Sequence, residues 1–91
     1  MNASFRSNVF SDTGFDAREA SALNAKSALV DEIAKIIGRR KLTSKQAASL
    51  CETKTALFSK ILRGHIELAT IELLARWLYA LGQTVEFRVR P

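Results

Sequence analysis

The residues of this 91-residue chain that most clearly indicate a chemical role are its basic side chains, which are concentrated in one stretch. Between residues 39 and 63 the sequence holds seven Lys and Arg and one acid, Glu52, so this stretch carries a net charge of +6. The other residues together carry −1, because the whole chain is +5. Cations gathered in a short segment of a small domain are typical of a surface that neutralises phosphates. A solvated basic face, or one that binds an acidic protein, has the same charge.

The other reactive side chains do not form a catalytic or metal-binding set. His65 follows Gly64 without a second ligand or a carboxylate at metal-binding spacing. Cys51 is the only cysteine, which excludes an intramolecular disulfide framework and a cysteine-rich zinc site. Its place on the apolar side of a short helical segment favours a buried thiol that packs as a small hydrophobic residue. We therefore expect no enzymatic activity, no bound metal and no cofactor.

The length and composition are those of one small globular domain. With 47% apolar and 25% charged residues, the chain can form one hydrophobic core but not two. Its first residues lack the charged start and apolar run of a signal peptide, and no stretch approaches the roughly 18 apolar residues that cross a bilayer. The sequence therefore predicts a cytoplasmic protein without a membrane partner.

The elements that position the basic stretch are predicted to be helices. Residues 1–15 are mostly small and polar with little periodicity, so we expect a flexible N-terminal arm there, followed by a single domain over residues 16–91. Asp16 can cap a long first helix, whose apolar residues recur at helical spacing. This helix should end near Gly38 to Lys41, where cations suit the negative end of its dipole.

Two short helices are predicted within residues 43–63. The capping box Thr43-Ser44-Lys45-Gln46 starts the second helix at Ser44, and Glu52-Thr53-Lys54 interrupts it after about two turns. A third helix begins near Thr55 and ends at Gly64, which suits a left-handed C-cap. Two short helices joined by a tight turn and flanked by basic residues follow the plan of a helix-turn-helix, which ordinary helical hairpins share.

Small and large apolar residues in these two helices support close packing between them. The paired Ala47 and Ala48 let the helices approach at a steep angle, and Phe58 and Ile61 are spaced to fill the gap. The sequence therefore predicts a fixed angle between the helices, which a larger side chain at Ala48 should break.

A fourth helix and a strand complete the predicted domain. Thr70 caps a helix with an apolar stripe, and Gly82 ends it. Residues 84–90 then alternate apolar and polar, which is typical of a half-buried strand with Val85, Phe87 and Val89 on one face. Because a lone strand cannot satisfy its own backbone groups, we expect these three residues to form a homodimer interface, by pairing with the other subunit or with an N-terminal arm.

Two strings in the centre of the chain resemble the core of the lambda-repressor-like (Cro/XRE) helix-turn-helix family: Leu42-Thr43-Ser44-Lys45-Gln46-Ala47-Ala48-Ser49-Leu50 and Phe58-Ser59-Lys60-Ile61-Leu62-Arg63-Gly64. The ends of the chain resemble, more specifically, the XRE-type antitoxins of HigBA-like toxin–antitoxin pairs, through Asn8-Val9-Phe10, Asp12 and Gly14-Phe15, and through Leu81-Gly82 and Val85-Glu86-Phe87-Arg88-Val89. The resemblance covers nearly the whole chain. It implies a homodimeric DNA-binding protein that represses its own operon and, in many members, neutralises a toxin encoded beside it.

The chain departs from the family pattern at three places. Glu52 stands where the family has a turn glycine, so either a strain of roughly 1–2 kcal/mol is present or the turn is built differently. Lys54 stands where the family has a Ser, Thr or Asp cap, so Thr53 or Thr55 is expected to take over the cap. Thr55-Ala56-Leu57 replaces a Gln-Pro-Arg run and offers no bidentate contact to guanine or adenine. We therefore expect modest sequence specificity, or specificity carried by Lys60 and by DNA shape.

The residues expected to bind DNA fall into two groups. Phosphate contacts are assigned to the starts of the second and third helices and to the end of the third: Ser44, Lys45, Lys54 and Arg63. Base-edge contacts in the major groove are assigned to the exposed face of the third helix: Thr55, Ala56, Ser59 and Lys60. Taken singly, each of these is also consistent with an ordinary solvated helix position.

The sequence as a whole predicts a mainly α, lambda-repressor-like fold with four helices and a C-terminal strand. Its predicted function is that of a transcriptional regulator that binds double-stranded DNA at a palindromic operator as a homodimer, and of an antitoxin that neutralises a toxin from the adjacent gene. Two alternatives stay open. One is a stand-alone or prophage-type repressor without a toxin, and the other is a protein-interaction module that has lost DNA binding, which Glu52, Lys54 and Leu57 favour.

Overall fold

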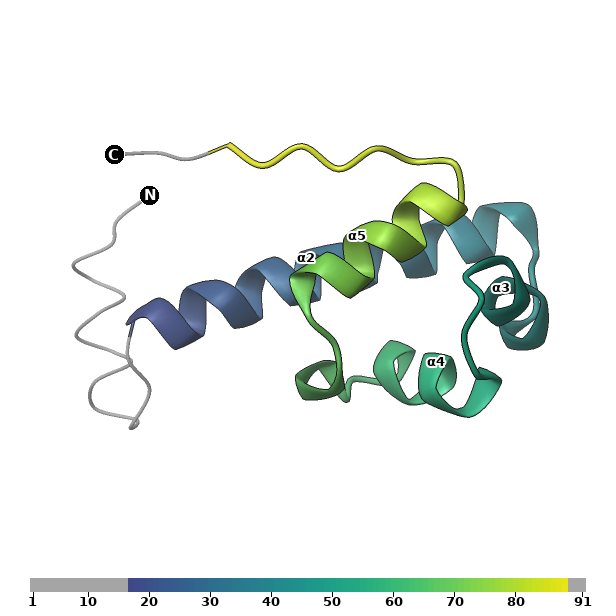
Figure 1. Ribbon diagram of the computed structural model, residues 1–91, viewed down its shortest axis with the longest axis horizontal. Coiled ribbons are helices and arrows are strands. Elements are labelled where there is room, and N and C mark those ends of the chain that lie inside the picture. The colour runs from purple at the N-terminus through teal and green to yellow at the C-terminus, as the bar shows by residue number, and fades with distance from the viewer. Residues whose placement is uncertain (1–16, 89–91) are drawn as a thin grey trace.

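The computed structural model describes residues 17–88, with side chains from Ala20 onward, and this part of the chain is mainly helical (Figure 1). Its elements, in chain order, are α2 (Ala17–Arg40), α3 (Ser44–Leu50), α4 (Thr55–Leu62), the short 3-10 helix η1 (Ile66–Leu68) and α5 (Ile71–Ala80). The predicted fold of four α-helices in these regions is confirmed. The N-terminal arm and its Asp16 cap lie outside the described residues.

The core lies between the C-terminal part of α2 and the other helices. In Figure 1, α5 runs beside α2, while α3 and α4 close the bundle on the other side. Ile33 of α2, Phe58 and Ile61 of α4 and Leu74 of α5 are completely buried. These are the apolar positions that helical spacing assigns to inward faces, so burial of one stripe per helix holds the bundle together.

Each of the four α-helices ends at a residue in the left-handed conformation. The φ angles are 53° at Lys41, 55° at Glu52, 121° at Gly64 and 93° at Gly82. In each case the N–H of the next residue donates to the carbonyl five residues earlier, over distances of 2.8 to 3.1 Å: Leu42 to Ile37, Thr53 to Ala48, His65 to Lys60 and Gln83 to Leu78. This is the Schellman motif, which satisfies carbonyls that the helix itself leaves free.

Only two of these four helix ends follow from the sequence. The left-handed conformations of Gly64 and Gly82 match the expectation, because glycine adopts them without strain. Glu52 holds the same conformation despite its side chain, so the strain considered for this turn is present. Nothing in the sequence around Lys41 indicates its left-handed conformation.

The predicted cap of α4 is wrong. Neither Thr53 nor Thr55 caps the helix; the N-cap is Lys54, with φ −72° and ψ 137°, and no side chain makes the cap hydrogen bond. The reason is the helix end just before it. Thr53 completes the Schellman motif of α3, so the extended residue that precedes the first helical residue is Lys54, which has no side-chain acceptor.

The segment between α4 and α5 contains a short helix that the sequence does not predict. Residues Ile66–Leu68 form η1, and Ala69 after it is buried. A single 3-10 turn has no periodicity long enough to detect, and η1 is positioned by its contacts with α2 and α4.

After Gly82 the chain is extended over residues 83–88 and runs back over α5 (Figure 1). Val85 is half-buried against the core, whereas Phe87 is 59% exposed. No strand is present within residues 17–88, so the predicted strand over residues 84–90 is not confirmed, and Val89 lies outside the described residues. None of the helices described is long and apolar enough to span a membrane.

Candidate nucleic-acid interface

The start of α3 is fixed by the predicted capping box. The Thr43 Oγ1 accepts a hydrogen bond from the Gln46 backbone N–H at 3.1 Å, and the Thr43 N–H donates to Gln46 Oε1 at 2.8 Å. Two of the backbone donors at this helix start are thereby satisfied within four residues. The start of α3 is consequently set by local sequence.

Close packing fixes α3 against α4. Ala47 and Ala48 are completely buried, and so are Phe58 and Ile61 on the facing side of α4. Methyl side chains at both alanine positions leave room for the two larger residues, which confirms the packing expected from the sequence. The turn between the helices consists of Cys51, the strained Glu52, Thr53 and Lys54.

The structure brings the candidate DNA-binding residues together on α3 and α4. Ser44, Lys45 and Lys54 are exposed at the starts of these helices. On α4, Thr55, Ala56 and Lys60 are exposed, Ser59 is half-buried, and Arg63 is exposed directly after the helix. At about 100° per residue these α4 positions share one side of the helix, opposite the buried Phe58 and Ile61. The outer side of α4 is therefore polar, narrow and free of large apolar side chains.

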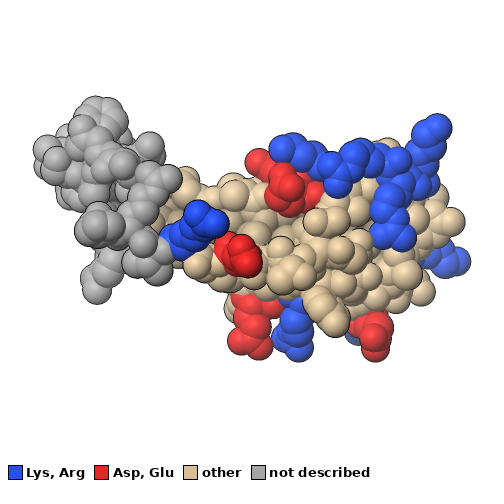
Figure 2. All heavy atoms as spheres, turned by 90° about the horizontal axis from the view of Figure 1, so that it is seen from above, with Lys and Arg blue, Asp and Glu red and all other residues tan. Residues whose placement is uncertain are grey.

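Within residues 20–88 no acidic side chain forms an ion pair with the cations of this part of the surface. Three ion pairs occur within residues 20–88: Lys35 with Glu32, His65 with Glu67, and Arg76 with Glu72. None of them involves a Lys or Arg between residues 39 and 63. Figure 2 shows basic side chains gathering over the end of the molecule where α2 finishes. These cations are therefore available to a ligand of opposite charge.

One of these cations has a structural contact that sequence reasoning missed. The guanidinium Nη1 of Arg40 donates to the Leu81 carbonyl oxygen at 3.1 Å, which joins the end of α2 to the end of α5. The partner is 41 residues away, so nothing in the local sequence could reveal it. A cation at the carbonyl end of α5 is also favoured by the helix dipole.

The starts of α3 and α4 carry no compensating negative charge. Neither helix has an acidic residue in its first turn, and α4 lacks a side-chain cap. The N-terminal N–H groups of an uncapped helix are donors that require an acceptor from water or from a ligand. Together with the dipole, they favour an anion such as a phosphate oxygen.

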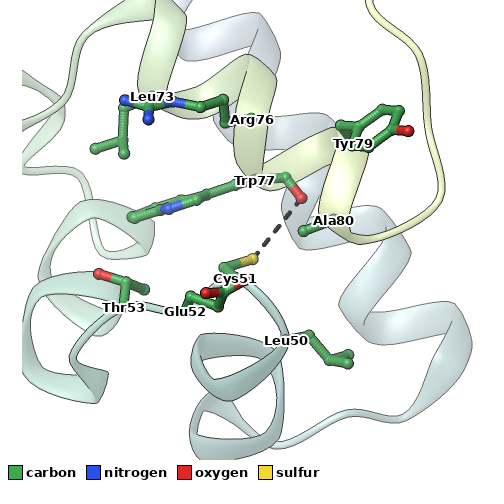
Figure 3. Close-up of a pocket in the computed structure, with 9 residues that line it drawn as sticks. All are labelled: Leu50, Cys51, Glu52, Thr53, Leu73, Arg76, Trp77, Tyr79 and Ala80. Carbon is green, nitrogen blue, oxygen red and sulfur yellow. Dashed lines mark hydrogen bonds between the residues drawn. The ribbon is translucent and has the colours of Figure 1, made fainter.

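A groove of about 480 Å³ lies between the end of α3 and α5, and nothing in the sequence indicates it (Figure 3). Its walls come from segments about 25 residues apart, so only the folded chain brings them together. Cys51 lies in it as a half-buried thiol whose Sγ donates to the Trp77 carbonyl oxygen over 3.7 Å. Burial raises the pKa of the Cys51 thiol to about 11, so little of the nucleophilic thiolate exists at neutral pH.

Metal binding has no support in the part of the chain that the structure describes. No group of three or more His, Cys, Asp or Glu side chains is arranged there to hold a metal ion. His65 and Glu67 lie 3.5 Å apart, but both are exposed. A pair of exposed side chains supplies neither the ligand number nor the enclosure of a metal site.

The sequence matches a known protein family. A protein-family model described as a helix-turn-helix domain matches residues 9–90, which is most of the chain. No curated protein and no solved structure matches it.

Proposed function

The chain belongs to the helix-turn-helix domain family, and from this premise we propose that it is a sequence-specific DNA-binding regulator of transcription. The proposal rests mainly on the polar outer side of α4, which lies beside the starts of α3 and α4. The cations on this surface form no ion pair with an acidic side chain within residues 20–88. An exposed helix of eight residues with this chemistry fits the major groove of DNA.

In the proposed complex, α4 is the recognition helix. Its outer residues Thr55, Ala56, Ser59 and Lys60 face base edges, where Thr and Ala methyl groups contact thymine and Lys60 approaches guanine acceptors. The DNA backbone is held by Ser44, Lys45, Lys54 and Arg63, with the uncapped start of α4 aimed at a phosphate. None of the four residues that face base edges is an Arg, Asn or Gln, side chains that make bidentate contacts to guanine or adenine. We therefore propose that DNA shape contributes to specificity.

We further propose a twofold homodimer that binds a palindromic operator. One recognition helix covers only a few base pairs, whereas a dimer places two of them in successive major grooves, roughly 34 Å apart. The residues proposed for the interface are Val85, Phe87 and Val89. Support comes from Phe87, which is a large apolar side chain left 59% exposed at the end of the described chain.

The resemblance of both chain ends to XRE-type antitoxins supports a finer proposal. The protein represses its own operon and neutralises a toxin encoded in the adjacent gene. A short basic reading frame next to this one favours the antitoxin, and its absence favours a stand-alone or prophage-type repressor. The proposal places the protein in the cytoplasm with its DNA and assigns it no cofactor and no catalytic step.

A titration with salt tests DNA binding itself. The binding of a fluorescent duplex from the chain's own upstream region is measured by anisotropy between about 50 and 200 mM salt. If about five phosphates are neutralised, the logarithm of the affinity falls with that of salt at a slope near −4 to −5. A flat response, or equal affinity for an unrelated duplex, contradicts a sequence-specific regulator and favours the protein-interaction module.

Single substitutions locate the interface. Lys60→Ala is expected to weaken binding and to relax the sequence preference, whereas Lys54→Ala is expected to weaken binding to all sequences and to reduce the salt slope by about one. Lys35→Ala is the matched control, because this exposed cation lies on α2 and is already paired with Glu32. A gel shift with and without the product of the neighbouring gene then tests the toxin partner.

A further inference from the structure

The groove beside α5 is separate from the surface assigned to DNA. It contains none of the eight proposed DNA-binding residues, and the buried indole of Trp77 lies in it (Figure 3). Two large apolar side chains that line it are open to solvent: Leu50 is 44% exposed and Tyr79 is 76% exposed. A volume of about 480 Å³ falls within the range of roughly 300–1,000 Å³ that is usual for binding sites. The groove is therefore large enough for an apolar side chain of a partner.

Charge in the groove defines what such a partner must carry. Glu52 lines the groove, and no ion pair within residues 20–88 involves it. The groove's Arg76 forms an ion pair with Glu72, at 3.8 Å. Glu52 is thus the charged residue of the groove without an ion-pair partner within residues 20–88, although it lies in the most basic stretch of the sequence. A basic residue next to an apolar one would complement it.

The C-terminal segment of the same chain has this chemistry. Residues 84–88 are extended and make no backbone hydrogen bond with any other residue that the structure describes. Phe87 is 59% exposed, and Arg88 beside it is exposed as well. An apolar ring followed by a cation matches the apolar walls of the groove and the carboxylate of Glu52.

Within one chain the extended segment starts next to the groove but leads away from it. Ala80 lines the groove, and the extended segment begins only two residues later, after Gly82. In Figure 1 the segment leads away from α3 and back over α5, and Phe87 is not among the residues that line the groove. From Gly82 to Phe87 the chain can reach about 16 Å at the rise of an extended strand. A twofold axis near the end of α5 would bring each segment to the groove of the other copy.

We infer that this groove binds the C-terminal segment of a second copy of the chain, with Phe87 between the apolar walls and Arg88 next to Glu52. Each copy does the same to the other, so the contact is made twice. The inference rests on the proposed homodimer and names the contact that holds it together. It differs from direct strand pairing between the two C-terminal segments, which leaves the groove empty.

Charge reversal tests the contact in the full-length protein without DNA. Sedimentation equilibrium gives the dimer dissociation constant for Glu52→Arg, for Arg88→Glu and for the double variant. Each single reversal is expected to weaken the dimer by roughly three- to tenfold, and the double variant is expected to recover most of the loss. Glu52→Arg keeps a side chain on the left-handed residue, so it leaves the backbone strain unchanged. Glu67→Arg, which makes the same charge change on η1, is the control and should leave the dimer unaltered.

Phe87→Ala gives an independent measurement of the apolar part of the contact. The expected weakening is tenfold or more, and Thr84→Ala in the same segment is the control with a small effect. If Glu52→Arg leaves the dimer unchanged, or the double variant fails to recover, the inference is overturned and strand pairing or a different interface takes its place.

The proposed function and the proposed dimer contact can be disproved independently of each other. A protein that dimerises through the groove but does not bind its upstream duplex contradicts the proposed function and leaves this inference standing. A protein that binds the duplex, with a dimer indifferent to Glu52, contradicts this inference alone.

Discussion

The ring of Phe58 lies against the indole of Trp77, with centroids 4.9 Å apart and planes inclined by 42°. This tilted contact joins the proposed recognition helix α4 to α5, and both rings are almost entirely buried. Phe58 also fills the space beneath the buried alanines of α3. One aromatic pair therefore fixes the position of α4 relative to two other helices, and tilted aromatic pairs add stabilisation beyond the area that they bury.

Phe58→Ala is accordingly expected to lower the free energy of unfolding by about 3–5 kcal/mol, because it removes a buried ring and leaves a cavity. That is a large fraction of the roughly 5–15 kcal/mol that holds a domain together. Trp77 is the only tryptophan, so its fluorescence reports the urea transition directly. Phe58→Leu, which conserves more volume, should cost much less, and equal costs for the two variants would contradict the packing described.

Glu52→Gly is expected to stabilise the fold by about 1 kcal/mol, because glycine adopts the left-handed conformation of this turn without strain. For a domain of this size the shift in Tm is about 4–8 °C. Glu52→Ala is the matched control, since it removes the same carboxylate but keeps the strain. The difference between the melting temperatures of the two variants measures the effect of the backbone strain alone. Similar melting temperatures would show that the turn holds no strain.

Ala48→Leu is expected to destabilise the protein by about 1–3 kcal/mol or more and to abolish DNA binding. The position is completely buried at the contact of α3 with α4, so added methyl groups must push the two helices apart. Circular dichroism in urea and the anisotropy assay measure the two effects. Ala34→Leu, at an exposed position of α2, is the control and should preserve both properties.

The Cys51 thiol is expected to react slowly with iodoacetamide at pH 8. With a pKa of about 11, the thiolate fraction is about a hundredfold lower than for an exposed thiol. The rate should rise with pH toward 11 and should jump when the protein is unfolded in urea. Since the folded state holds the proton more tightly, this group stabilises the fold below about pH 9, and that contribution is lost as the pH rises toward 11. Equal rates in native and unfolded protein would show that the thiol is not desolvated.

Removal of residues 84–91 is expected to leave a folded monomer with weak DNA binding. Val85 is the only described residue of this segment that packs against the core, so most of the domain keeps its contacts. Analytical ultracentrifugation measures the mass, and circular dichroism verifies the helices. A truncated chain that still dimerises would move the interface elsewhere.

Local signals in the sequence predicted the helices and failed where distant segments decide the structure. The capping box at Thr43 fixed the start of α3 because both partners lie within four residues. The cap of α4 was missed because the end of α3 uses Thr53 and leaves Lys54 in the cap position. The groove, the η1 turn and the contact between Arg40 and Leu81 all depend on segments that meet only after folding. Of the candidate site, the sequence predicted the exposure of Thr55, Ala56 and Lys60 on α4, whereas Ser59 is half-buried. The left-handed conformation of Lys41 before α3 was not predicted.

The hydrogen bond from Arg40 to the Leu81 carbonyl joins two places that the proposals treat separately. Arg40 belongs to the basic stretch just ahead of α3, and Leu81 directly precedes the glycine from which the C-terminal segment departs. One corner of the molecule therefore carries both the proposed approach to DNA and the start of the segment proposed for the dimer contact. If both proposals hold, a duplex that reorients Arg40 also acts on the origin of that segment, so we expect operator occupancy and subunit association to influence each other through this guanidinium.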